Sequence, residues 1–149
     1  MVDPIDQLIQ EQDLHAALPV DLGFLRDAFD IVYLPFSGST MGFAFAGESA
    51  SVIGINAGLH VYQQRTVLAH EAAHLLCRHP NSFYLCKLDD WFYLQWEWEA
   101  QRQAARLLIP RRPLLSLAIE GATVRDLQEA FRVPADLVEL RLKMVIQGR

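Results

Sequence analysis

The pentapeptide His-Glu-Ala-Ala-His at residues 70–74 constrains this chain more than any other feature. On a helix, residues i and i+4 lie one turn apart on the same face, so His70 and His74 can reach one metal ion. Glu71 is offset from that pair and can approach a water on the metal instead. A metal lowers the pKa of such a water toward neutrality, and a neighbouring carboxylate can then act as general base. The pattern therefore indicates metal-dependent peptide hydrolysis, with Glu71 as the catalytic residue.

A hydrolytic zinc site needs a third protein ligand and leaves its fourth position to water. Two glutamates, Glu97 and Glu99, lie in a segment at 91–109 whose length and apolar spacing predict one helix. At about 100° per residue, Glu97 shares a stripe of mostly small or apolar residues with Ala100 and Ala104. Glu99 falls on the opposite side among charged residues, which is typical of a solvated face. We predict Glu97 as the third ligand, and Glu99 stays open as the alternative.

Other interpretations of these residues are less specific. The motif can occur by chance in an amphipathic helix that carries two ordinary histidines, and Glu97 can instead pair with an arginine. The competing class of function is a non-enzymatic binding module, a sensor or anti-repressor that keeps the metal as a scaffold. Glu71 argues against that class, because a structural site usually has four protein ligands and gains nothing from a base.

Three motifs in this order and spacing resemble the ImmA/IrrE family of small metallopeptidases. The matching stretches are the strand end at 52–56, the helix at 69–76 and the segment at 97–110, and the tail at 127–142 also fits. The chain departs from the usual family pattern at Ala73, Arg78 and Gln103, where glycine, histidine and phenylalanine are common. None of these departures removes a metal ligand or the base.

The resemblance implies a zinc-dependent endopeptidase that cleaves a helix-turn-helix transcriptional repressor, often in stress responses or in the control of mobile elements. It makes His70, His74 and Glu97 the metal ligands and Glu71 the catalytic base. The expected cofactor is Zn²⁺, with Mn²⁺ as the alternative. The expected partner is a protein substrate.

The fold class expected from the patterns is α+β. Short apolar runs at 31–36, 42–46 and 51–55 predict strands, and longer periodic segments predict helices at about 59–78, at 91–109 and in three short pieces after Pro110. Because the links between the strands are short, we expect antiparallel neighbours. The prediction is a small three-stranded antiparallel sheet packed on the two ligand helices, with a C-terminal helical cap, in a zincin-like arrangement.

Two units are predicted along the chain: a metallopeptidase domain at 1–110, and a small helical subdomain at 111–149 packed on it. A substrate can bind beside a metal site by adding an extended strand to an exposed sheet edge. We assign that substrate-binding role to the third strand. Its residues are Val52, Ile53, Gly54 and Ile55.

Composition and charge exclude several classes of function. The net charge is −5, and no basic cluster exceeds the pair Arg111 and Arg112, so direct nucleic-acid binding is not expected. No run of 18 or more apolar residues predicts a membrane span. The acidic N-terminal residues lack the basic-then-apolar pattern of an export signal. We expect a cytoplasmic protein.

Overall fold

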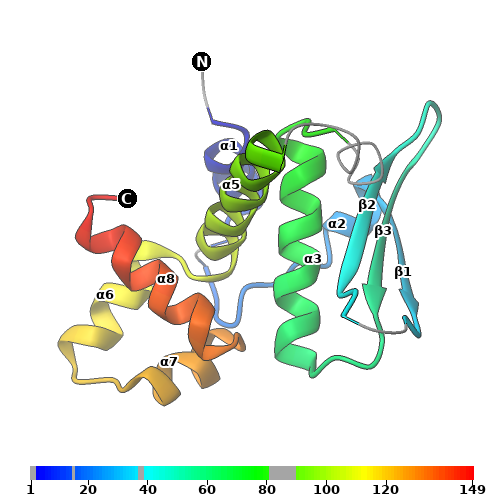
Figure 1. Ribbon diagram of the computed structural model, residues 1–149. Helices are drawn as coiled ribbons and strands as arrows, with labels where there is room; N and C mark the ends of the chain where they lie inside the picture. The colour runs from blue at the N-terminus through cyan, green and yellow to red at the C-terminus, as the bar shows by residue number, and fades with distance from the viewer. Residues whose placement is uncertain (1–2, 15, 37–38, 81–89) are drawn as a thin grey trace.

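The computed structural model describes residues 3–14, 16–36, 39–80 and 90–149. Its architecture is α+β, which confirms the predicted class (Figure 1). The predicted strands and helices appear within a few residues of their expected bounds. In chain order the elements are α1 (Pro4–Glu11), α2 (Leu25–Ala28), β1 (Asp30–Leu34), β2 (Gly42–Ala46), β3 (Ser51–Asn56), α3 (Val61–Leu76), α5 (Asp90–Leu108), α6 (Arg111–Ile119), α7 (Val124–Phe131) and α8 (Ala135–Ile146).

The sheet is mixed rather than antiparallel, which corrects the prediction. β3 lies between β1 and β2, and it pairs in parallel with β1 and antiparallel with β2. A short turn joins β2 to β3, and in it the Gly47 amide donates to the Ala50 carbonyl at 2.9 Å. The link from β1 to β2 spans about 10 Å, two strand spacings, and β3 fills the gap between them. The strands joined by each short link do run antiparallel, but β1 and β2 are not neighbours, and β3 pairs in parallel with β1.

The prediction that Val52, Ile53, Gly54 and Ile55 form an exposed edge is wrong. β3 is the central strand, so its backbone is paired with a strand on each side. The side chains of Ile53 and Ile55 are fully buried, because a central strand under a helix carries a continuous apolar run. The strand edge beside α3 that is left without a partner among the described strands belongs to β2.

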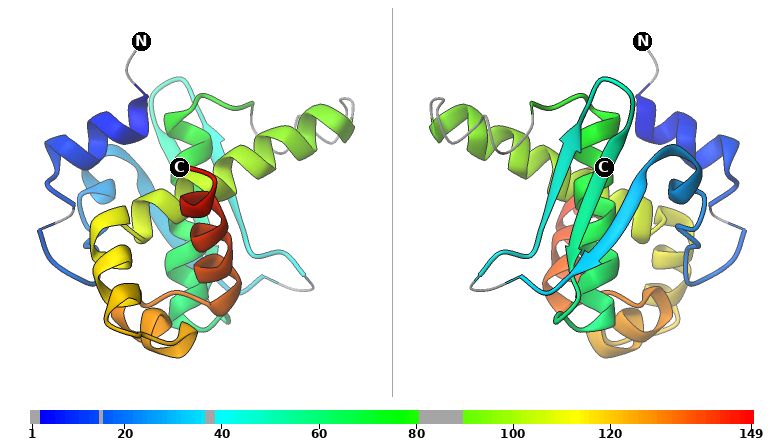
Figure 2. Two further views of the ribbon diagram at one scale, coloured as in Figure 1. Left: turned by 90° about the vertical axis from the view of Figure 1, so that its left-hand side faces the viewer. Right: turned by 90° about the vertical axis from the view of Figure 1, so that its right-hand side faces the viewer.

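Helix α3 forms the centre of the molecule, with the sheet on one side and α5 crossing it on the other (Figures 1 and 2). Small side chains let two helices approach closely. Both helices carry fully buried alanines, namely Ala69, Ala72 and Ala73 on α3 and Ala100, Ala104 and Ala105 on α5, and the two helices are in contact. The two predicted ligand helices are therefore held side by side.

Of the C-terminal helices, α8 packs back onto α5, and α7 packs on α8. Arg141 on α8 is almost fully buried, and its Nε donates to the Ile109 carbonyl, just after α5, at 2.8 Å. One buried apolar cluster extends from Ile5 to Met144. The division into units at 1–110 and 111–149 stays a prediction.

No helix in the described ranges combines the length and the apolar composition that a bilayer span needs.

Candidate metal centre

The middle of α3 supplies three of the predicted site residues. His70 and His74 lie one turn apart, and the line between their ring centroids measures 4.8 Å. Their Nε2 atoms are 3.1 Å apart, so both nitrogens point to the same place. His74 and Glu71 are buried, with 6% and 9% of their surfaces exposed. The helical spacing thus brings the two imidazoles together, as the sequence predicts.

Helix α5 brings Glu97 to the same place. Its two carboxylate oxygens lie 2.9 Å from His70 Nε2 and 2.9 Å from His74 Nε2. The three side chains offer ligand atoms that all lie within 4.8 Å of one another. Two imidazoles and one carboxylate are a donor set that three-ligand zinc sites use.

The partners of the other ring nitrogens show why a cation fits here. His70 Nδ1 lies 2.9 Å from Gln101 Oε1, an amide oxygen that can only accept a hydrogen bond. A neutral His70 therefore keeps its proton on Nδ1 and turns an Nε2 lone pair toward the Glu97 carboxylate. His74 Nδ1 likewise has a partner, His79 Nδ1, at 3.0 Å. When both rings are neutral and carry their protons on Nδ1, lone pairs from three side chains converge, an arrangement that a metal ion satisfies.

A Schellman turn at the end of α3 places His79 beside His74. Arg78 adopts a left-handed conformation with φ 58°, and the His79 amide donates back to the His74 carbonyl at 2.9 Å. His79 Nε2 then lies 3.0 Å from Glu99 Oε2. Glu99, which was predicted on a solvated face, is partly exposed but is tied to His74 through His79. Its carboxylate does not take part in the group formed by His70, His74 and Glu97.

Charge at the site follows from this packing. Burial alone opposes ionisation, but the hydrogen bonds and charge of Glu97 outweigh it and raise the pKa of His70. For Glu97, hydrogen bonds from both imidazoles overcome the effect of burial and lower its pKa to about 2. Burial raises the pKa of Glu71 above its ordinary value, although the nearby imidazoles act in the opposite direction. A carboxylate with a raised pKa is a better general base near neutral pH.

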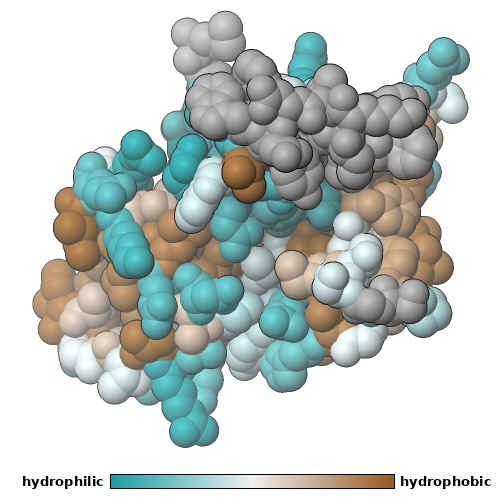
Figure 3. Space-filling view, viewed as in Figure 1, coloured by the Kyte–Doolittle hydropathy of each residue, from teal (hydrophilic) through white to brown (hydrophobic). Residues whose placement is uncertain are grey.

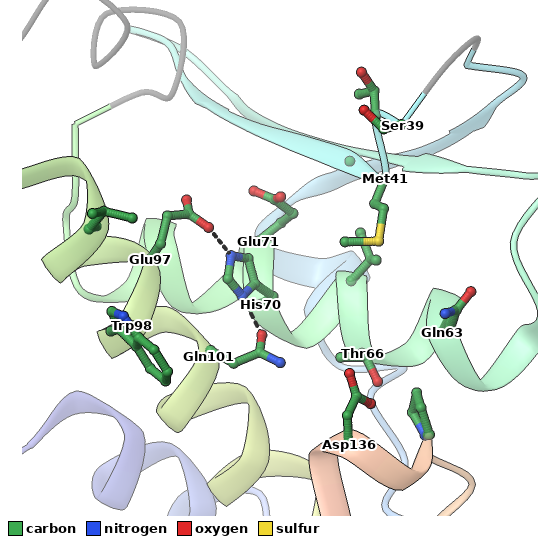
Figure 4. Close-up of a pocket in the computed structure, with 15 residues that line it drawn as sticks. Ser39, Met41, Gln63, Thr66, His70, Glu71, Glu97, Trp98, Gln101 and Asp136 are labelled. Atoms are coloured by element: carbon green, nitrogen blue, oxygen red, sulfur yellow. Dashed lines mark hydrogen bonds and ion pairs between the residues drawn. The ribbon is translucent and has the colours of Figure 1, made fainter. Parts of the chain in front are cut away.

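The convergent side chains open into a cavity of about 640 Å³. It is bounded by the start of β2, by α3 and α5, and by the start of α8. In Figure 4, His70 lies between Glu97 and Gln101, and Glu71 extends into the same space from α3. Hydrophilic residues gather along the middle of this face, between apolar areas over the C-terminal helices and over the sheet (Figure 3). The cavity lining itself combines polar side chains such as Gln63 and Asp136 with apolar ones such as Met41 and Trp98.

Gly42 lets β2 pass close to the site. A Cβ atom added to Gly42 would lie 2.5 Å from Val67 Cγ1, 2.7 Å from the Gly54 carbonyl oxygen and 3.5 Å from Glu71 Cγ. Real Cβ atoms do not approach a backbone oxygen so closely, so a side chain would push β2 away from α3. The edge strand and the side chain of Glu71 are neighbours for this reason.

A comparison with known protein families matches residues 27–143 to the IrrE N-terminal-like domain, Peptidase_M78. The chain belongs to this peptidase family. The match runs from α2 into α8 and contains all four residues of the predicted centre. Among curated proteins, no match is found. The Peptidase_M78 match and the convergent His and Glu ligands together indicate a metallopeptidase.

Sequence reasoning missed two residues of this Peptidase_M78 site. Gln101 could have been found from its position, because it follows Glu97 by four residues and so lies on the same helix face. His79 could not have been found in the same way, because the left-handed turn at Arg78 is not visible in a pattern of apolar spacing. Both side chains orient a histidine that faces the centre.

Proposed function

We propose that this chain is a zinc-dependent endopeptidase of the cytoplasm and that its substrate is a helix-turn-helix transcriptional repressor. The observation that carries the proposal is the position of Glu71, which is buried on α3 and lines the same cavity as His70 and Glu97. A structural metal site has no use for a base at this position.

The proposed metal ligands are His70, His74 and Glu97. We favour Zn²⁺ over Mn²⁺, because imidazole-rich sites with three protein ligands suit zinc, whereas manganese prefers oxygen ligands. When bound, zinc would lower the pKa of a water molecule and polarise the scissile carbonyl. Gln101 and His79 accept the Nδ1 protons of the two histidines and so hold their rings in position.

Glu71 is the proposed general base. Its carboxylate would accept the proton of the attacking water and then deliver it to the amine that leaves. The raised pKa of Glu71 favours both transfers, since the group has to be ionised before attack and protonated after it. Burial also keeps bulk water away from the proton while it resides on Glu71.

An extended segment of substrate fits the open edge of β2. This strand is paired on one side with β3, and it begins at the cavity wall formed by Met41 and Gly42. Backbone pairing would place the peptide across the site without requiring a particular sequence. A substrate with an extended segment is supported by the edge of β2 that has no partner among the described strands, and a basic repressor is supported by the net charge of −5.

The test uses zinc-loaded wild type and Glu71→Gln, incubated with full-length helix-turn-helix repressors and, in parallel, with a proteome-derived peptide library. Mass spectrometry of new chain ends reads cleavage, and elemental analysis confirms that both proteins carry metal. We expect the wild type to cut and Glu71→Gln to be slower by about 10²- to 10⁴-fold, the usual contribution of a general base.

Two outcomes would overturn parts of the proposal. Cleavage by Glu71→Gln at the wild-type rate would contradict the assignment of Glu71 as the general base. Cleavage of library peptides without cleavage of any repressor would leave an endopeptidase with a different class of protein substrate.

A further inference from the structure

A second group of metal-binding side chains lies next to the centre already described. Cys77, His79 and Glu99 each offer one ligand atom, and these atoms all lie within 4.8 Å of one another. Sulfur, imidazole nitrogen and carboxylate oxygen are the three donor types that zinc takes in proteins. We propose that Cys77, His79 and Glu99 form a second site for a thiophilic divalent cation such as Zn²⁺, and that filling it weakens metal binding at His70, His74 and Glu97.

The backbone holds these three donors in place. Cys77 ends α3, and its amide donates to the Ala73 carbonyl at 2.9 Å. The turn at Arg78 then folds His79 back over the last turn of the helix. Glu99 comes from α5, which packs against α3, and its carboxylate already lies 3.0 Å from His79 Nε2. Two rigid helices and a tight turn therefore define the cluster.

The surroundings of Cys77 suit a cation better than a bare thiolate. Burial, followed by the negative charge of Glu99, raises the pKa of Cys77 to about 11. The thiol is thus protonated in the absence of metal. Without a cation, the negative charge of Glu99 opposes ionisation of the Cys77 thiol. A divalent cation between the two groups would be bound by both of them and would favour release of the proton from the sulfur.

The position of one proton links the two sites. When His74 Nε2 binds a metal, the neutral ring carries its proton on Nδ1 and donates it to His79 Nδ1, 3.0 Å away. His79 must then hold its own proton on Nε2, facing Glu99. A metal on His79 Nε2 would move that proton to Nδ1. Two N–H groups would then face each other, so the hydrogen bond that orients His74 is lost.

The sites should therefore oppose each other. The loss of one buried hydrogen bond corresponds to a change of about tenfold in affinity. By linkage, a metal at the first centre weakens the second site by the same factor. This antagonism rests on the proposed function, since it requires a metal on His74, whereas the second site itself does not.

Cobalt titration of the metal-free full chain, kept reduced with a phosphine, tests both parts. Co²⁺ bound to a thiolate gives an intense charge-transfer band in the near ultraviolet, whereas Co²⁺ on two imidazoles and a carboxylate gives weak visible bands alone. We expect the weak bands with the first equivalent and the charge-transfer band with the second. Cys77→Ser should abolish the charge-transfer band, and the matched variant Cys86→Ser, at the chain's other cysteine, should keep it.

Glu97→Ala supplies the test of antagonism. With the first centre weakened, the charge-transfer band should appear at the first equivalent and at about tenfold lower free Co²⁺. An unchanged affinity in Glu97→Ala would overturn the antagonism. The second site would be overturned if the wild type never shows the charge-transfer band, or if Cys77→Ser retains it. The cluster would then serve only to hold His74 by hydrogen bonds. If the first centre does not bind metal, the charge-transfer band appears in the wild type with the first equivalent of Co²⁺. Failure of the proposed function and failure of the second site therefore give different results.

Discussion

His70, His74 and Glu97 turn their ligand atoms toward one point. The protons that these side chains carry determine how metal binding should depend on pH. Gln101 fixes the His70 proton on Nδ1, so His70 Nε2 is free for a metal when the ring is neutral. Without metal, a second proton on this ring is favoured by Glu97, and the pKa of His70 is raised from its ordinary value of 6.5. Metal and proton therefore compete for the same nitrogen.

The affinity for Zn²⁺ should fall as the pH is lowered, and the fall should begin above pH 6.5, the ordinary pKa of histidine. One displaced proton corresponds to about a tenfold loss per pH unit below the raised pKa. Glu97, with a pKa of about 2, stays ionised and adds nothing to the slope in this range. Chelator competition between about pH 5 and pH 8 measures the profile. An affinity that does not change with pH would contradict the assignment of His70 as a ligand.

At the scale of elements, the close packing of β2 on α3 brings a strand edge to the site. Gly42→Ala should lower the free energy of unfolding by about 1–3 kcal/mol, because its Cβ would meet the Gly54 carbonyl oxygen at 2.7 Å and the neighbours would have to shift. Gly58→Ala is the matched control, since its nearest atom is 3.3 Å away in a side chain. Urea denaturation of both variants measures the difference. Equal stabilities would show that β2 does not need this glycine.

The elements themselves were predictable because their signals are local. Apolar spacing placed α3 and α5 within a few residues, and it put Glu97 on the inward stripe. The order of the strands was not predictable in this way. β3 enters between β1 and β2, and this insertion depends on contacts between strands that are distant in sequence. The assignment of residues 52–55 to an exposed edge failed for that reason.

At the scale of the whole molecule, a buried arginine connects the C-terminal helices to the end of α5. Arg141 is 3% exposed, and burial lowers its pKa to about 10. Its guanidinium donates to the backbone carbonyls of Ile109 and Arg149, at 2.8 and 3.2 Å. If the Arg141 side chain were truncated, the Ile109 carbonyl would lose this hydrogen-bond donor.

Arg141→Ala should lower the free energy of unfolding by about 1–3 kcal/mol, the cost of a buried acceptor without a partner. Arg125→Ala, at a side chain that is 85% exposed, should change it by less than about 0.5 kcal/mol. Thermal or urea unfolding compares the two variants. If Arg141→Ala is as stable as Arg125→Ala, the guanidinium does not anchor these helices.

The site as a whole was partly predictable. The predicted ligand pair and Glu71 lie in one short motif, so their geometry follows from a single helix. The partners of their other nitrogens come from α5 and from the turn after α3, and the chain reversal that brings His79 back depends on the backbone conformation of Arg78. Spacing along a helix carries no information about such a turn.

The most direct test of the metal centre is the metal content of the purified protein, measured by elemental mass spectrometry after zinc loading and desalting. Three proteins are compared, all carrying Cys77→Ser so that the proposed second site is removed: one with Glu97 and Glu99 intact, here called the wild type, and the variants Glu97→Ala and Glu99→Ala. We predict about one zinc per chain in the wild type, almost none in Glu97→Ala, and about one in Glu99→Ala. A wild type without zinc, or a loss of zinc in Glu99→Ala but not in Glu97→Ala, would contradict the account.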